Sequence, residues 1–149
     1  MNFKSLSARW IASAPHFLSL LRILAAAMFI LAGTIKLIAF PMGIPPDGTT
    51  APLFSQMWLA GILETFGGAS LLLGLFTRPV AFILAGEMAV TYFQFYASIS
   101  FWPVVNNGVL PALYCFVWLY ISAAGPGSWS LDAVRKDRLD SGSYRLTED

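Results

Sequence analysis

The sequence predicts an all-α membrane protein, a four-helix transmembrane bundle with both termini in the cytoplasm. Of its 149 residues, 57% are hydrophobic and only 11% are charged, and the mean hydropathy is positive. This leaves too little polar surface to cover a water-soluble globule of this size. In addition, the apolar residues gather in four runs, each close to the ~20 residues with which a helix crosses a hydrocarbon core of ~30 Å.

The apolar runs are separated by loops rich in Pro, Gly and Asn, which end helices. We expect transmembrane helices at residues 17–40, 54–76, 79–99 and 105–124. The second and third are joined at Thr77 to Pro79, a link so short that it predicts a helical hairpin. Residues 1–128 then form one membrane domain, and residues 129–149 form a tail that begins a short amphipathic helix, with Ser130 as its N-cap.

The positions of the cations predict the orientation. Apart from Lys36 near the outer end of the first run, they lie before or at the start of the first run, between the second and third, and in the tail: Lys4, Arg9, Arg22, Arg78, Arg135, Lys136, Arg138 and Arg145. Because Lys and Arg are retained on the cytoplasmic side, we expect a multi-pass protein of the cell (inner or plasma) membrane, with Arg22 and Arg78 as topology anchors. A cleaved signal peptide is the rival interpretation of the first run, since Ile23 to Ile35 has the length of its apolar region.

Two carboxylates lie inside the predicted membrane helices. Glu64 is near the middle of the second, and Glu87 is the sole charged side chain between Arg78 and Asp132. A carboxylate at this depth costs ~2.5 kcal/mol or more unless it is protonated, paired or hydrated, so such residues usually face the bundle interior. On the third helix, Glu87 begins a polar stripe with Thr91, Gln94 and Ser98 at helical spacing.

We therefore predict one polar pocket in the outer half of the bundle, to which all four helices contribute. Its candidate residues are Lys36, Glu64, Glu87, Thr91, Gln94, Asn107 and Tyr114. One ammonium faces two carboxylates, so we expect one Glu to be protonated at neutral pH or to exchange protons. Two plainer interpretations stay open: Lys36 can extend to the outer lipid headgroups, and the two Glu can form a purely structural pair.

The residue inventory excludes several kinds of chemistry. One His and one Cys do not supply bis-histidine haem ligation, an iron-sulfur cluster or a catalytic zinc, so we expect no metal site and no intrinsic cofactor. A net charge of +1 without a basic stripe argues against nucleic-acid binding. Electron transfer would need a quinone or a partner subunit, and the residues assign no catalytic side chain.

Four motifs in order resemble the DoxX family of small four-helix membrane proteins. They are LAGTIKL (31–37), LETFGGASLLLGLFTRP (63–79), NNG (106–108) and GPGSWSLD (125–132). The resemblance puts Lys36, Glu64, Arg78 and Asn107 on the family pattern, and Glu87 less firmly. It implies a redox-associated membrane subunit, non-catalytic within a quinone-linked oxidoreductase complex, with soluble or membrane redox subunits as partners.

Two other functions compete with that expectation. In a small proton-coupled transporter or permease, the same pocket would bind a solute, and the two Glu would couple it to protons. In a membrane anchor, the tail would hold a soluble enzyme. The sequence does not identify the ligand.

Overall fold

The computed structural model describes residues 3–145, with side chains for residues 9–139. The outermost ends of the predicted domain and tail, residues 1–2 and 146–149, lie outside this range, as do the side chains of Lys4 and Arg145. Apart from an isolated bridge between Ile44 and Thr49, the regular structure of the described part is helical. Its elements are α1 (Phe3–Ile38), α2 (Gln56–Ile62), a π-helical turn η1 (Leu63–Gly67), α3 (Gly68–Leu73), α4 (Thr77–Thr91), a second π-helical turn η2 (Tyr92–Tyr96), α5 (Val109–Ala124) and α6 (Leu131–Arg145).

The ends of these helices follow local backbone chemistry. Ser55 begins α2 because its side chain accepts a hydrogen bond from the Trp58 N–H, and Gly74 ends α3 in the left-handed region at φ 70°. The helix expected from residue 105 starts only at Val109, since Asn107 has φ 60° and cannot continue a right-handed helix. The first helix begins well before residue 17 and runs through Pro15.

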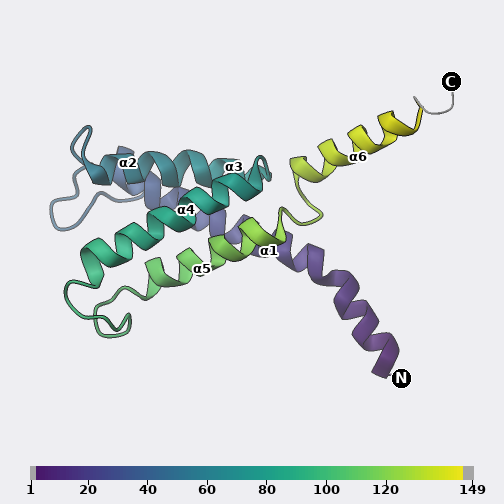
Figure 1. Cartoon of the computed structure of the whole chain (residues 1–149). Coiled ribbons are helices and arrows are strands. Elements are labelled where there is room, and N and C mark those ends of the chain that lie inside the picture. The colour runs from purple at the N-terminus through teal and green to yellow at the C-terminus, as the bar shows by residue number, and fades with distance from the viewer. Residues whose placement is uncertain (1–2, 146–149) are drawn as a thin grey trace.

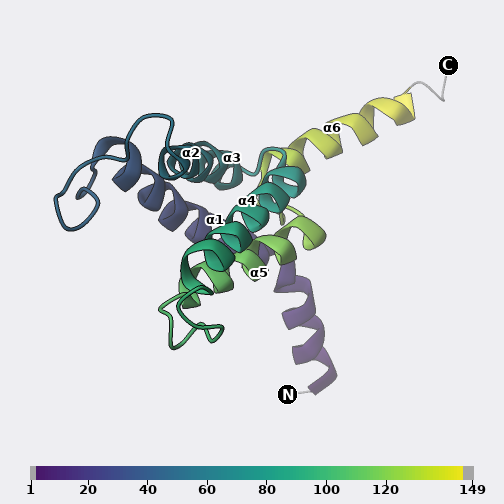
Figure 2. The same ribbon diagram turned by 60° about the vertical axis from the view of Figure 1, so that its left-hand side comes forward.

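The helices pack as two hairpins (Figures 1 and 2). In one, α1 lies against α2, η1 and α3, and in the other α4 lies against α5. The loops 39–55 and 97–108 lie at one end of the packed helices. The α3–α4 turn, α6 and the first part of α1 lie at the other end, from which α6 and the start of α1 project (Figure 1).

A small core joins the two hairpins. Phe29 of α1 is buried, and its ring lies 5.3 Å from that of the fully buried Trp118 on α5. Leu71 of α3 and Leu84 of α4 are also fully buried and belong to the same cluster. α1 therefore supplies part of the core that joins the two hairpins.

Most large side chains on the outside of the packed helices are apolar. Exposed examples occur on every helix of the two hairpins and include Leu24, Met28, Phe66, Leu73, Phe82, Ile83, Val90, Phe93, Leu113, Phe116 and Tyr120. Such a continuous apolar exterior marks a surface that does not face water. In the described part of the chain, the segment Arg9–Ile38 is long and apolar enough to cross a bilayer, and Val109–Ala124 is a shorter apolar helix.

Candidate functional site

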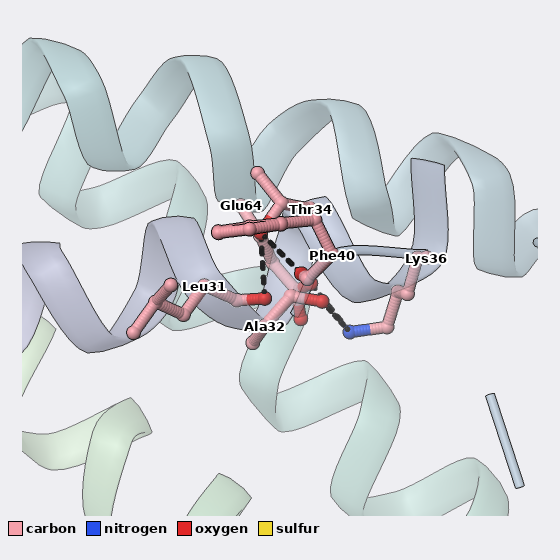
Figure 3. A network of polar contacts seen from close by, with 6 residues as sticks. All are labelled: Leu31, Ala32, Thr34, Lys36, Phe40 and Glu64. Carbon is pink, nitrogen blue, oxygen red and sulfur yellow. Dashed lines mark hydrogen bonds and ion pairs between the residues drawn. The ribbon is translucent and has the colours of Figure 1, made fainter. Parts of the chain in front are cut away.

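An ion pair joins the first hairpin near the end that carries the loops 39–55 and 97–108. Lys36 lies in the last turn of α1, and its Nζ donates to Oε2 of Glu64 and, at 3.4 Å, to the carbonyl of Ala32 (Figure 3). The Glu64 side chain is 5% exposed and that of Lys36 is 22% exposed. The contact expected between Lys36 and a carboxylate is therefore formed, and Lys36 does not extend outward alone.

Glycines bring the two backbones close enough for this pair. A Cβ at Gly33 of α1 would lie 2.7 Å from the carbonyl oxygen of Gly61, and a Cβ at Gly68 would lie 2.8 Å from Ile30. Glu64 itself sits in the π-helical turn η1, which widens the helix where α1 approaches. Such single π turns inside α-helices are frequent at functional sites.

Glu87 brings a second carboxyl to the same place from the other hairpin. It lies on α4, and both of its side-chain oxygens are buried without a hydrogen-bond partner. The charges of Glu64 and Lys36 both act on it. Three ionisable side chains from α1, η1 and α4 thus share one site.

These side chains line a cavity of about 640 Å³ between the hairpins. Its polar lining consists of Lys36, Gln56, Glu64, Glu87, Thr91, Tyr96 and Tyr114. The lining also includes apolar side chains that are themselves exposed on the outer surface: Met28, Met57, Leu59, Leu63, Ile83, Val90, Phe95 and Leu110. The cavity therefore combines a charged interior with an apolar rim that faces the flank of the protein.

The structure brings most, not all, of the expected pocket residues together. Gln94 does not line the cavity; its side chain exchanges hydrogen bonds with Gln56 at 2.5 and 3.1 Å on the exposed surface. The polar stripe that starts at Glu87 is interrupted because η2 has more residues per turn than an α-helix, so after Thr91 the cavity is lined by Phe95 and Tyr96 and not by Gln94. Ser98 is likewise outside the lining.

The expected place of Asn107 in the pocket is wrong. Asn107 precedes α5 and is exposed, so it does not share a helical face with Tyr114. Its neighbour Asn106 is buried instead, donates to the carbonyl of Ser100 at 2.7 Å and accepts from the Gly108 N–H at 2.7 Å. The NNG motif therefore shapes the loop before α5.

Gln56 and Tyr96 are lining residues that the sequence interpretation missed. Gln56 is the first residue of α2, directly after the Ser55 N-cap, and Tyr96 is the last residue of η2. Both lie at helix ends, outside the set of residues from which we predicted the pocket. Gln56 could have been predicted from the sequence, because it is a polar side chain in the first turn of a predicted membrane helix, beside the predicted polar stripe of the third helix.

The opposite end of the helices is held by charged side chains on backbone groups. Arg22 is fully buried and donates to the carbonyls of Leu71, Leu72, Pro126 and Trp129. Arg78 donates to the last carbonyls of α5, at Ser122 and Ala123. Both arginines thus link helix ends through hydrogen bonds to backbone carbonyls. Their role as topology anchors, which depends on their positive charge, stays a prediction.

Asp132 of α6 closes the start of α4. Its carboxylate accepts from the backbone N–H groups of Phe76 and Thr77 at 3.1 and 2.9 Å. Burial alone would raise the pKa of Asp132, but these hydrogen bonds and the charge of Arg135 hold it below its usual value. Ser130 caps α6 as predicted, since its hydroxyl accepts from the Ala133 N–H at 3.1 Å.

An all-helical fold, an apolar exterior and charged side chains enclosed among apolar helices together define a helical membrane protein. Residues 17–97 match the model of the DoxX family, and the chain belongs to this family. It is also 42% identical over 121 residues to an uncharacterized protein of Haemophilus influenzae, an alignment that covers 79% of this chain and 90% of that protein. No solved structure matches the chain.

Proposed function

We propose that the protein is a multi-pass membrane subunit whose four helical rods, α1, α2–η1–α3, α4–η2 and α5, each cross the bilayer, with both termini in the cytoplasm. The placement of α6 and the start of α1 at the same end supports an even number of crossings. The cations Arg22, Arg78, Arg135 and Lys136 lie at that end or in the segments that leave it, which supports its cytoplasmic location.

We propose further that the cavity binds the head group of a lipophilic small molecule, with a quinone as the leading ligand. The observation that carries this proposal is the apolar, outward-facing rim around a Lys–Glu–Glu interior. A quinone has the matching shape, because its polar ring carries an apolar tail that can stay among the acyl chains. When bound, it would supply two-electron redox chemistry, for which partner subunits would hold the other centres.

Titration of a short-tailed quinone into the purified protein in lipid nanodiscs tests this function. We expect saturable binding above that of empty nanodiscs, and a loss of about tenfold in affinity for Glu64→Gln, since this change removes the negative charge that pairs with Lys36 and orients it. Asp47→Asn, the same carboxylate-to-amide change on the exposed loop, is the matched control and should bind like the unchanged protein. Absence of saturable binding contradicts the proposal.

A proton-coupled transporter is the second candidate, favoured by the unpartnered carboxyl of Glu87 inside the cavity. Uptake of a solute into vesicles that depends on a proton gradient, without quinone binding, would select it.

A further inference from the structure

The polar groups of the cavity differ in how many of their hydrogen-bond donors and acceptors remain free for a ligand. The Glu64 carboxylate is engaged by Lys36, whose Nζ also reaches the Ala32 carbonyl. An ammonium has three hydrogens, so Lys36 keeps one for a ligand. Tyr114 also lines the cavity and carries a hydroxyl that can donate.

Both side-chain oxygens of Glu87 are buried without a hydrogen-bond partner among the described residues. The ionisable groups of the cavity lining are Lys36 on α1, Glu64 on η1, Tyr96 on η2 and Tyr114 on α5, and on α4 Glu87 itself. The one cation in this set already pairs with Glu64, and the Glu64 charge repels a second carboxylate. A buried charge without a counter-charge is strongly disfavoured, so this environment favours the neutral form of Glu87.

A neutral carboxyl carries an O–H donor, and this donor has no acceptor among the described residues. With Lys36 and Tyr114, it places three hydrogen-bond donors in the cavity lining. A carbonyl oxygen, which accepts hydrogen bonds and has no hydrogen to donate, is the ligand group that matches these donors. Buried polar groups are otherwise partnered, so the unpaired Glu87 carboxyl marks the place in the lining where such an oxygen would bind.

We infer that protonated Glu87 donates a hydrogen bond to a carbonyl oxygen of the lipophilic ligand, so that the ligand and one proton bind together. This inference rests on the proposed function of the cavity and adds the chemistry of recognition. Ionised Glu87 has no hydrogen to donate and repels a carbonyl oxygen. Ligand affinity must therefore fall as Glu87 loses its proton.

Quinone affinity measured against pH tests this linkage in the full-length protein in nanodiscs. Linkage to one proton weakens binding by up to about tenfold per pH unit once the group ionises, so we expect a loss of about tenfold or more between about pH 6 and about pH 9. Glu87→Gln keeps an N–H donor but cannot ionise. This variant should bind with nearly the same affinity at every pH, close to the low-pH affinity of the unchanged protein.

A control variant and three possible results separate the role of Glu87 from the proposed function of the cavity. Asp47→Asn should keep the full pH dependence, because Asp47 is exposed on the loop between α1 and α2. Saturable binding with no pH dependence in the unchanged protein overturns the role of Glu87 and leaves the proposed function standing. An equal pH dependence in Glu87→Gln also overturns it, whereas absence of binding at every pH contradicts the proposed function itself.

Discussion

At the scale of single residues, Lys36 is the side chain on which the site depends most. It supplies the only positive charge in the cavity lining, and Glu64 opposite is almost fully buried. Removal of one partner of a buried pair leaves an uncompensated charge, which costs ~3 to 5 kcal/mol. Because the Lys36 side chain is 22% exposed, we expect Lys36→Met to lower the free energy of unfolding by about 3 kcal/mol.

Denaturant titration in detergent micelles measures this loss. Lys136→Met on α6 is the control, since Lys136 is exposed and does not line the large cavity. The double variant Lys36→Met, Glu64→Gln should recover part of the stability, because it removes the orphaned charge as well. Unchanged stability of Lys36→Met would show that the pair contributes nothing to the fold.

Asp132 offers a second test at this scale, through pH. Its pKa is lower in the folded protein than in the unfolded chain, so its contribution is present above the unfolded value and is lost as the pH falls through the folded value. We expect Asp132→Asn to cost about 1 kcal/mol near neutral pH, as other lost caps do. Below about pH 4, where unfolded Asp residues protonate, the difference from the unchanged protein should shrink.

Thermal unfolding followed at several pH values checks this expectation. Asp47→Asn changes an exposed carboxylate on the loop between α1 and α2. Its unfolding temperature should equal that of the unchanged protein at every pH. A difference between Asp132→Asn and the unchanged protein that grows toward acid pH would contradict the capping role.

The sequence predicted the charged residues of the site better than its neutral ones. Lys36, Glu64 and Glu87 could be identified because a charged side chain in an apolar run usually faces the interior of the helix bundle, where it can be paired. Gln94 and Asn107 were misplaced because their positions depend on local backbone geometry, a π turn at η2 and a left-handed residue before α5. Neither feature produces a periodic pattern in the sequence. Helical spacing alone therefore continued the polar stripe past Thr91 and started the last helix too early.

At the scale of elements, the close approach of α1 to α2 and η1 depends on glycine. The backbone of η1 and the Gly61 carbonyl leave no room for a side chain at Gly33. We expect Gly33→Ala to push the two elements apart and to destabilise the protein by about 1 to 3 kcal/mol, the usual cost of overpacking. It should also weaken quinone binding, because Lys36 and Glu64 lie on the two separated elements.

Gly86 provides the matched control for that substitution. A Cβ at Gly86 of α4 would meet nothing within 4 Å, and its backbone is helical. Gly86→Ala should therefore be neutral or slightly stabilising, by at most about 1 kcal/mol. Equal effects of the two substitutions in the same unfolding assay would rule out close packing at Gly33.

At the scale of the whole molecule, the proposed topology can be tested by thiol labelling in intact cells. Cys115 is the one cysteine of the chain, and Cys115→Ser gives a background without it. In this background, a membrane-impermeant maleimide should label Asp47→Cys from outside and should label Lys136→Cys only after the cells are opened. Labelling of Lys136→Cys in intact cells would reverse the proposed orientation.

The all-helical fold was accessible from the sequence, because length, hydropathy and breakers such as Gly74 and Gly125 locate apolar helices almost independently of tertiary contacts. The roles of Arg22 and Asp132 were not, since they depend on which helix ends meet. Arg22 was predicted as a topology anchor and Asp132 fell in the predicted tail helix, yet they hold α3, α4 and the segment before α6 together. Long-range contacts of this kind leave no trace in local spacing.

The central claim is that a lipophilic ligand enters the cavity between the two hairpins and meets Lys36, Glu64 and Glu87. The most direct measurement is photolabelling in native membranes with a quinone analogue that carries a photoreactive group on its ring, followed by peptide mapping. We expect adducts on cavity-lining residues such as Met57, Met88 and Tyr114, which excess unlabelled quinone prevents. Adducts confined to the lipid-facing side chains Phe82 and Phe116, insensitive to competition, would contradict it.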